Sequence, residues 1–245
     1  MGGLARRAAV LQTWKEKHNA LAVAGGYELS QPEHEALHTA LQIFPSAFEE
    51  LGYDFGALSR AEAQQLQTAS PEHNTLPSEW TTFSFQPQTA VFTHQGLRLG
   101  LIVLPEADMS LSGTDQPDEE ILFTKTNKTL QSLNKSCDLT IGLSPWGWKQ
   151  EKHFLASKAS KPGLLLGSGP GPAVQGKLSA DGRTLWIRPY SRGRALNIIT
   201  IDDPQEKGWK EGWKINTNVR HQFQVLDQTV PIDPDMENLL NSILR

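Results

Sequence analysis

Two histidines four residues apart form the most recognisable chemical motif of the sequence. His34, Glu35 and His38 fit the pattern His-Glu-x-x-His. On a helix this spacing puts both imidazoles on one face, where they can bind zinc while the glutamate acts as general base. Ser30 and Pro32, however, put His34 in the exposed first turn of the expected helix. No third ligand stands nearby, so a solvated helix start is the preferred interpretation and zinc the alternative.

An acidic segment offers another metal possibility. Asp108 and Glu119 stand at the first and twelfth positions of a stretch with the spacing of a calcium-binding loop. Residues 105–120 contain six carboxylates and no basic side chain. Pro117 does not fit the pattern, and the serines between are poor ligands. An ordinary acidic surface loop is therefore preferred.

The pattern of residues 137–172 predicts a parallel strand–helix–strand unit. The loops in which such a unit usually carries its functional side chains contain no charged, histidine or cysteine residue. Two short apolar runs are separated by an amphipathic helix. In these units ligands gather at the carboxyl ends of the strands, here the loops 144–147 and 168–172. Neither loop contains Asp, Glu, His, Cys, Lys or Arg. Nor does the second loop suit a phosphate, because Pro170 and Pro172 have no backbone N–H to offer.

Four tryptophans mark a different kind of candidate surface. Trp146 and Trp148 lie in or beside the first of these loops, and Trp209 and Trp213 lie in a hydrophilic segment. Exposed tryptophans are common where proteins dock. Either each indole packs beneath its own loop, or the four together form an interaction surface over the strand-end loops.

The remaining pattern is that of an α/β protein. Helices are expected over 4–18, 30–51 with a break or kink at Pro45, 60–67, 120–133 and 235–244, and one more between the loop 144–147 and the strand 163–167. Strands are expected over 20–24, 89–93, 97–104, 138–143, 163–167, 184–189, 195–201 and 222–226. Net charge of −4 gives no electrostatic case for nucleic acid or an anionic membrane. The apolar runs are far shorter than the ~20 residues of a membrane span, and no repeat or linker divides residues 1–245. We therefore predict a single domain.

The order of these features resembles a known family. Gly2 to Arg7 reads Gly-Gly-Leu-Ala-Arg-Arg, and the hairpin arm 96–103 follows a Gly-x-x-x-Gly-x-Ile pattern. Together they resemble the catalytic domain of calcineurin-like metallophosphoesterases, in particular the 5′-nucleotidase and UDP-sugar hydrolase branch. The resemblance implies an αββα sandwich of two mixed sheets. It also implies that the opening strand of the family is missing, and that no C-terminal nucleotide-binding domain follows.

The same resemblance removes the family's metal ligands. That family uses two metal ions to clamp a phosphoryl group and activate a water. In this sequence the ligand positions fall on Tyr27, Arg60, Ala61, Pro145, Gly169 and Gly171, with only Glu62 retained from the Gly-Asn-His-Glu motif. We therefore expect no metal, no cofactor and no catalytic residue at this site.

Two functions follow as hypotheses. The first is a non-catalytic metallophosphoesterase-like module that binds another protein or a small ligand. The second is a metal-dependent phosphoesterase with relocated ligands, or a zinc hydrolase acting through the two histidines. Relatives in the family are usually exported, so a periplasmic or extracellular location is expected from resemblance, although no secretory signal opens the sequence. A cytoplasmic location stays open.

Overall fold

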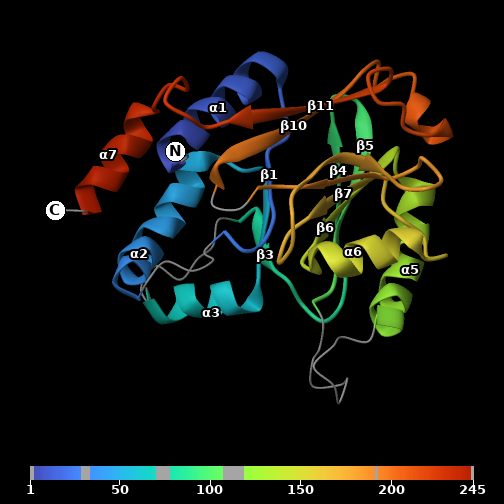
Figure 1. Cartoon of the computed structure of the whole chain (residues 1–245), viewed down its shortest axis with the longest axis horizontal. Coiled ribbons are helices and arrows are strands. Elements are labelled where there is room, and N and C mark those ends of the chain that lie inside the picture. Colours follow the sequence, from blue (N-terminus) through green and yellow to red (C-terminus); the bar gives the residue numbers. More distant parts are fainter. Residues whose placement is uncertain (1–2, 29–33, 70–77, 107–118, 191–192, 244–245) are drawn as a thin grey trace. The chain divides into compact units, whose positions relative to one another are not determined.

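The computed structural model describes residues 3–28, 34–69, 78–106, 119–190 and 193–243 (Figure 1). The chain divides into two compact units. The first consists of residues 1–82, 190–196 and 224–245, and the second of residues 83–189 and 197–223.

The first unit surrounds a three-stranded parallel sheet with helices. The sheet has the order β1-β2-β3. Its strands are β1 (Val23–Ala24), β2 (Phe55–Leu58) and β3 (Trp80–Thr82), and its helices are α1 (Leu4–His18), α2 (His34–Leu51), α3 (Arg60–Ala69) and α7 (Pro234–Ile243). The helix α1 contacts α2 and α7, and α2 contacts α3.

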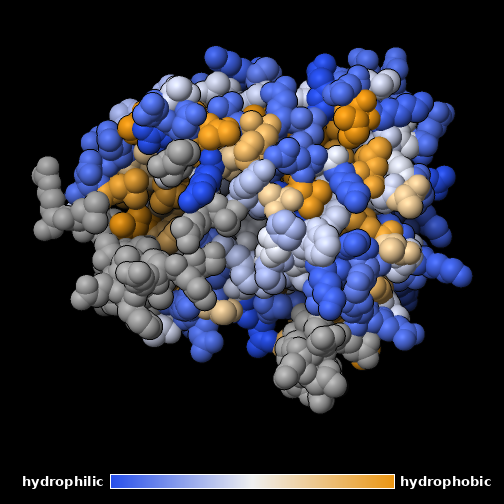
Figure 2. Space-filling model, viewed as in Figure 1, coloured by the Kyte–Doolittle hydropathy of each residue, from blue (hydrophilic) through white to orange (hydrophobic). Residues whose placement is uncertain are grey.

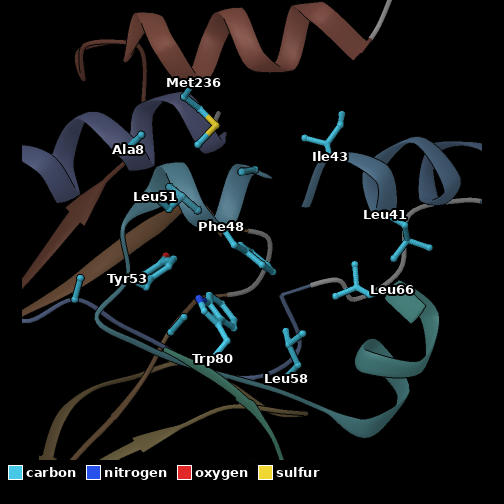
Figure 3. Packing of buried hydrophobic residues seen from close by; sticks show 13 residues of the cluster. Ala8, Leu41, Ile43, Phe48, Leu51, Tyr53, Leu58, Leu66, Trp80 and Met236 are labelled. Atoms are coloured by element: carbon cyan, nitrogen blue, oxygen red, sulfur yellow. The ribbon is translucent and has the colours of Figure 1, made fainter. Parts of the chain in front are cut away.

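Aromatic and aliphatic side chains from all of these elements meet in one core (Figure 3). Phe48 of α2 stacks on Trp80 of β3, with 4.3 Å between ring centroids. Tyr53 meets the same indole edge-on, and Met236 of α7 is fully buried in this cluster. Gly56 lies against the indole of Trp80, so that even a methyl group at this position would overlap the ring.

The helix α2 corrects one expectation. The sequence predicts a break or a kink at Pro45; the break is wrong, because α2 runs from His34 to Leu51 with the proline inside it, and the kink stays a prediction. A proline in a helix forfeits one hydrogen bond to the preceding turn. Buried Leu41 before it, and Ala47 and Phe48 after it, belong to the same core cluster. Their packing outweighs the lost bond, so the helix continues.

The second unit is built on a six-stranded mixed sheet with the order β4-β5-β6-β7-β9-β8. Its strands are β4 (Gln88–His94), β5 (Leu97–Val103), β6 (Leu139–Ser144), β7 (Leu164–Gly167), β8 (Val174–Leu178) and β9 (Leu185–Arg188). The strands β5, β6, β7 and β9 are parallel, while β4 and β8 are antiparallel to their neighbours. The predicted parallel strand–helix–strand unit is therefore confirmed as β6-α6-β7.

Two helices pack on this sheet. The helix α5 (Glu119–Ser136) contacts β5 and β6, and α6 (Gly147–Ala156) contacts β7 and α5 (Figure 1). The core beneath them contains Trp146 and Phe154, with Phe123 packed against both. Within the described residues, no helix is long and apolar enough to cross a membrane.

The sheets differ in detail from the expected pair. A separate two-stranded sheet joins β10 (Ala195–Ile201) and β11 (Val219–Val225). The three-stranded sheet is entirely parallel rather than mixed. The strands β2, β3 and β8 were not expected, because they are short and, in β2 and β8, interrupted by glycine.

The core of the first unit gives a stability prediction. Phe48→Ala removes a ring that is 1% exposed and stacked on Trp80, so we expect a loss of about 3–5 kcal/mol in the free energy of unfolding. Urea denaturation followed by circular dichroism measures it. The matched control Glu49→Ala, on the exposed side of the same helix, should stay within about 0.5 kcal/mol of the parent. Equal effects of the two substitutions would contradict the packing described.

Candidate functional site

Neighbouring parallel strands of the first unit end where the sequence placed candidate positions. Tyr27 follows β1, and Arg60 and Ala61 open α3 just after β2. Tyr27 has a left-handed backbone (φ 69°) and its side chain is 36% exposed. Arg60 and Ala61 are also exposed. A phenol, a guanidinium and a methyl group therefore stand at this end of the sheet.

Glu62, the retained motif residue, is committed to the backbone. It is 5% exposed. Its Oε2 accepts hydrogen bonds from the N–H of Tyr27 at 2.8 Å and from the N–H of Ser59 at 2.7 Å. The N–H of Glu62 in turn donates to Oγ of Ser59 at 3.2 Å. This reciprocal pair is a capping box for α3, and the third bond ties the loop after β1 to it.

A second polar cluster of the first unit surrounds Arg7. The Arg7 guanidinium, which is 7% exposed, donates to Glu28 Oε2 at 2.7 Å and to the Tyr53 hydroxyl at 3.3 Å. Burial raises the pKa of Tyr53 to about 12, outweighing the opposite effect of Arg7. The phenol thus stays protonated at neutral pH and cannot serve as a base.

In the second unit the two strand-end loops bind each other. The N–H and Oγ of Ser168 both donate to the carbonyl oxygen of Ser144, at 2.8 and 2.7 Å. Returning bonds run from the N–H of Gly147 to the carbonyl of Ser168 and from the N–H of Trp148 to the carbonyl of Pro170. The loops after β6 and β7 are therefore closed onto each other along their backbones.

Glycines make this contact possible. A methyl group on Gly147 would lie 2.7 Å from the carbonyl oxygen of Pro170, and one on Gly171 would overlap Cβ of Trp148. Gly147, Gly169 and Gly171 all have positive φ, at 79°, 75° and 121°, a conformation that favours glycine. No larger side chain fits at Gly147 or Gly171 without moving the loops apart.

A buried guanidinium holds the second loop from beneath. Arg188, at the end of β9, is 2% exposed. Its nitrogens donate to four carbonyl oxygens of the loop, those of Ser168, Gly169, Pro170 and Pro172, at 2.8–3.2 Å. Its Nη1 also forms an ion pair with Oε1 of Glu151 at 2.6 Å. Four of the five N–H groups of the guanidinium are therefore used by the loop carbonyls, and the carboxylate balances the charge.

The carboxylate of Glu151 completes this arrangement. Glu151 lies on α6 and is fully buried, and its Oε2 accepts a hydrogen bond from the indole N–H of Trp186 at 2.7 Å. Burial raises the pKa of Glu151, while Arg188 and Trp186 act in the opposite direction. Gly167 is required beside it, because any Cβ there would overlap the carboxylate.

Three of the four candidate tryptophans are buried, which does not support an exposed indole surface. Trp146 is 6% exposed and donates its indole N–H to the carbonyl of Pro105 at 2.6 Å. Trp209 and Trp213 stack at 5.8 Å and donate to the carbonyls of Asp138 and Gly163. These carbonyls precede β6 and β7, at the end of the sheet opposite to the loops.

Only Trp148 keeps partial exposure, and there the Lys152 ammonium lies 5.0 Å from the ring centroid.

The segment that carries Trp209 is also held by an ion pair. Asp138 accepts a hydrogen bond from Lys207 at 2.6 Å, which lowers its pKa to about 2. The contact between Asp138 and Lys207 therefore stabilises the folded state above the usual aspartate pKa, and this stabilisation is lost as the pH falls towards 2.

The other metal candidates lie only partly within the described residues. His34 and His38 lie in the first turns of α2, and Asp108 lies outside the described residues. Glu119 begins α5 and contacts Nδ1 of His153 at 3.0 Å. Across the described part of the chain there is no group of three or more His, Cys, Asp or Glu side chains that could hold a metal ion.

Comparison with known proteins identifies the architecture. Neither a family model nor a curated protein sequence matches the chain. Solved structures do: a 5′-nucleotidase precursor from Thermus thermophilus (TM-score 0.70, 15% identity, 99% of this chain and 52% of that one) and the sulfate thiohydrolase SoxB from the same species (TM-score 0.73, 15% identity, 100% and 47%). The chain has a 5′-nucleotidase-like metallophosphoesterase fold. The NAD nucleotidase of Haemophilus influenzae is also similar (TM-score 0.62, 11% identity, 100% and 56%).

This chain spans about half the length of each of these structures.

A metallophosphoesterase fold implies a pair of divalent ions, and the residues present in the second unit do not fit them. Pro145, Gly169 and Gly171 supply no side-chain ligand. The carbonyls of Gly169 and Pro170 already bind Arg188, whose positive charge would repel a metal ion brought to the same oxygens.

Glu62 gives a prediction for the first unit. Glu62→Ala removes the carboxylate that accepts from the partly buried N–H of Tyr27 and the buried N–H of Ser59, so we expect a loss of about 1–3 kcal/mol in the free energy of unfolding. Glu62→Gln should lose less, because its amide oxygen still accepts. Urea unfolding curves measure both. The exposed Gln64→Ala on the same helix serves as control, and an equally large loss in that variant would contradict the capping role.

Arg188 gives a prediction for the second unit. Arg188→Met removes the counter-charge of the buried Glu151 carboxylate and one hydrogen bond from each of four loop carbonyls, so we expect a loss of about 3–5 kcal/mol in the free energy of unfolding. Adding Glu151→Leu to this variant should restore part of that loss, because the unpaired charge is removed. Denaturant titration of both variants tests this. The exposed Arg183→Met should be near neutral, and an unchanged stability of Arg188→Met would disprove the buried pair.

Proposed function

We propose that this chain is a non-catalytic metallophosphoesterase-like domain that works by binding another protein or a small ligand. The observation that supports this most is the hydrogen bonding of the loop 168–172 to Arg188. Four of its carbonyls bind an internal guanidinium. A positive charge is thus supplied permanently by the protein at the strand-end loop.

The chemistry of the other positions points the same way. Hydrolysis by two metal ions needs carboxylate, imidazole or amide ligands at the strand ends. Tyr27, Arg60 and Ala61 offer no such set in the first unit, and Glu62 is occupied by two backbone N–H groups. Each loop keeps a well-bonded backbone, which suits a scaffold whose role is to hold a shape.

The partner of such a scaffold is proposed by class alone. The face in Figure 2 is mostly hydrophilic, with hydrophobic residues in separate patches, and the net charge of −4 does not favour nucleic acid. We also propose, from resemblance, that residues 1–245 act as one domain and that the protein is exported.

A metal-dependent phosphoesterase with relocated ligands is the alternative. It is favoured by the structural similarity to proteins named as nucleotidases. Its candidate ligands would be His34 and His38, or Asp108 with Glu119. Among these Glu119 already contacts His153, so a metal there would have to displace an existing partner.

Metal analysis and a phosphoesterase assay separate the two functions. The protein is purified without chelator, its Mn, Fe, Zn and Ca content is measured by mass spectrometry, and hydrolysis of p-nitrophenyl phosphate and its diester is followed with added Mn²⁺ and Zn²⁺. We expect metal well below one ion per chain and no turnover, because the strand-end groups are not ligands.

An active dinuclear metallophosphoesterase, assayed in parallel, shows that the conditions support turnover. One tightly bound ion or more per chain, together with hydrolysis above background, would remove the non-catalytic proposal. The double variant His34→Ala/His38→Ala then reports whether the histidine pair holds the ion.

A further inference from the structure

The strand β4 forms an outer edge of the six-stranded sheet, and half of its backbone groups face away from its neighbour. The turn Gln95-Gly96 has positive φ at both residues, at 50° and 76°, and joins the directly paired His94 and Leu97. In such two-residue hairpins the pair next to the turn is hydrogen bonded. Starting with the residue before His94, every second residue along β4 therefore directs its backbone N–H and C=O away from β5. The outward set is Thr89, Val91 and Thr93. All three are exposed, Val91 by 44%.

The strand β8 at the opposite edge of the sheet has features that prevent pairing with another strand, and the residues of β4 have none of them. In β8 the register shifts between Val174 and Lys177, Gly176 has a positive φ of 68°, and Lys177 brings an exposed charge. Bulges and lysines are common devices against edge-to-edge pairing. Gln88–His94, by contrast, pairs with β5 in unbroken register and contains no proline, lysine, arginine or carboxylate.

The sequence of β4 is also complementary to itself. Val91 lies at the middle of the outward set, with a threonine two residues away on each side. If two copies of β4 run antiparallel about Val91, valine meets valine and Thr89 meets Thr93 of the second copy. Pairs of β-branched residues across strands are favourable, and no like charges are brought together. An arbitrary partner strand would not explain this symmetry.

We propose that a second copy of this chain docks on β4, antiparallel and two-fold symmetric about Val91, so that one sheet continues through both copies. Each outward residue supplies one N–H and one C=O to the other copy. The same patch serves both partners, as in the commonest type of homodimer. The pairing does not depend on the absence of catalysis, so the mass measurements below and the metal analysis can fail separately.

The first test measures mass against concentration. A strand-to-strand contact is small, and small interfaces are usually transient. Sedimentation velocity from roughly 5 to 500 μM, a range chosen for such transient contacts, should show the mass rising from 27.1 kDa towards twice that value. Val91→Lys should weaken association at least tenfold, because two lysines would face each other. Val225→Lys, at a 39%-exposed strand valine elsewhere, is the matched control.

A charge-pair design tests the register itself. Val91→Lys and Val91→Glu should each stay monomeric alone, yet associate when mixed, since the symmetry places the new lysine opposite the new glutamate. Thr89→Glu combined with Thr93→Lys in one chain should strengthen association, because an antiparallel pair brings the opposite charges together. Thr89→Lys combined with Thr93→Lys should abolish it.

The proposal is overturned by several outcomes. Wild type that stays monomeric over the whole range removes it, as does association that Val91→Lys leaves unchanged. A mixture of Val91→Lys and Val91→Glu that gains no mass rules out the two-fold axis at Val91. Circular dichroism of each variant checks that the fold is kept, and if Val91→Lys does not fold, the two Thr89/Thr93 variants decide alone.

Discussion

The buried guanidinium of Arg188 is the contact on which the strand-end region of the second unit depends. A charged side chain that is 2% exposed is stable only when its charge and its donors are matched. Here one carboxylate balances the charge and four carbonyl oxygens take the remaining donors. The planar fork of arginine suits this set, which a lysine ammonium with three donors could not satisfy. Without it the carbonyls of Gly169 and Pro172 would lose their bonds to the guanidinium, while those of Ser168 and Pro170 would keep only their bonds from the N–H groups of Gly147 and Trp148.

The same physical problem is solved in the first unit with the opposite charge. Where a strand ends, backbone groups that have left the sheet still need hydrogen bonds. After β7 the groups to be satisfied are carbonyls, and a cation meets them. After β1 and β2 they are N–H groups, and the carboxylate of Glu62 accepts from both Tyr27 and Ser59. In both units a side chain stabilises the loop backbone at the carboxyl ends of parallel strands, where ligands gather in many α/β proteins.

Local patterns in the sequence explain much of the fold. The apolar runs 138–143 and 163–167, with an amphipathic helix between them, predict β6-α6-β7. A turn at 94–96 predicts the β4-β5 hairpin, in which His94 in fact belongs to β4. The strand β2 was missed because four residues with a central glycine give no periodic signal, and its place is fixed by the Trp80 indole. The capping box of Ser59 and Glu62 could have been predicted from the sequence, because a serine followed three residues later by a glutamate is a local pattern. The Glu151–Arg188 pair was not, because its partners are far apart in the sequence and only the folded sheet brings them together.

The fold and the chemistry of its strand ends therefore have to be judged separately. The glycines of the second unit show why. A histidine at position 171 would not simply add a ligand, because its Cβ would overlap Trp148 and its backbone would have to adopt φ 121°. The neighbouring carbonyl of Gly169 would still be bound to Arg188. Building a metal site here would require the loop, the tryptophan and the buried arginine to change together. A change in one of them alone would leave a steric overlap or an unpaired buried charge, so the closed arrangement is held in place by its own packing.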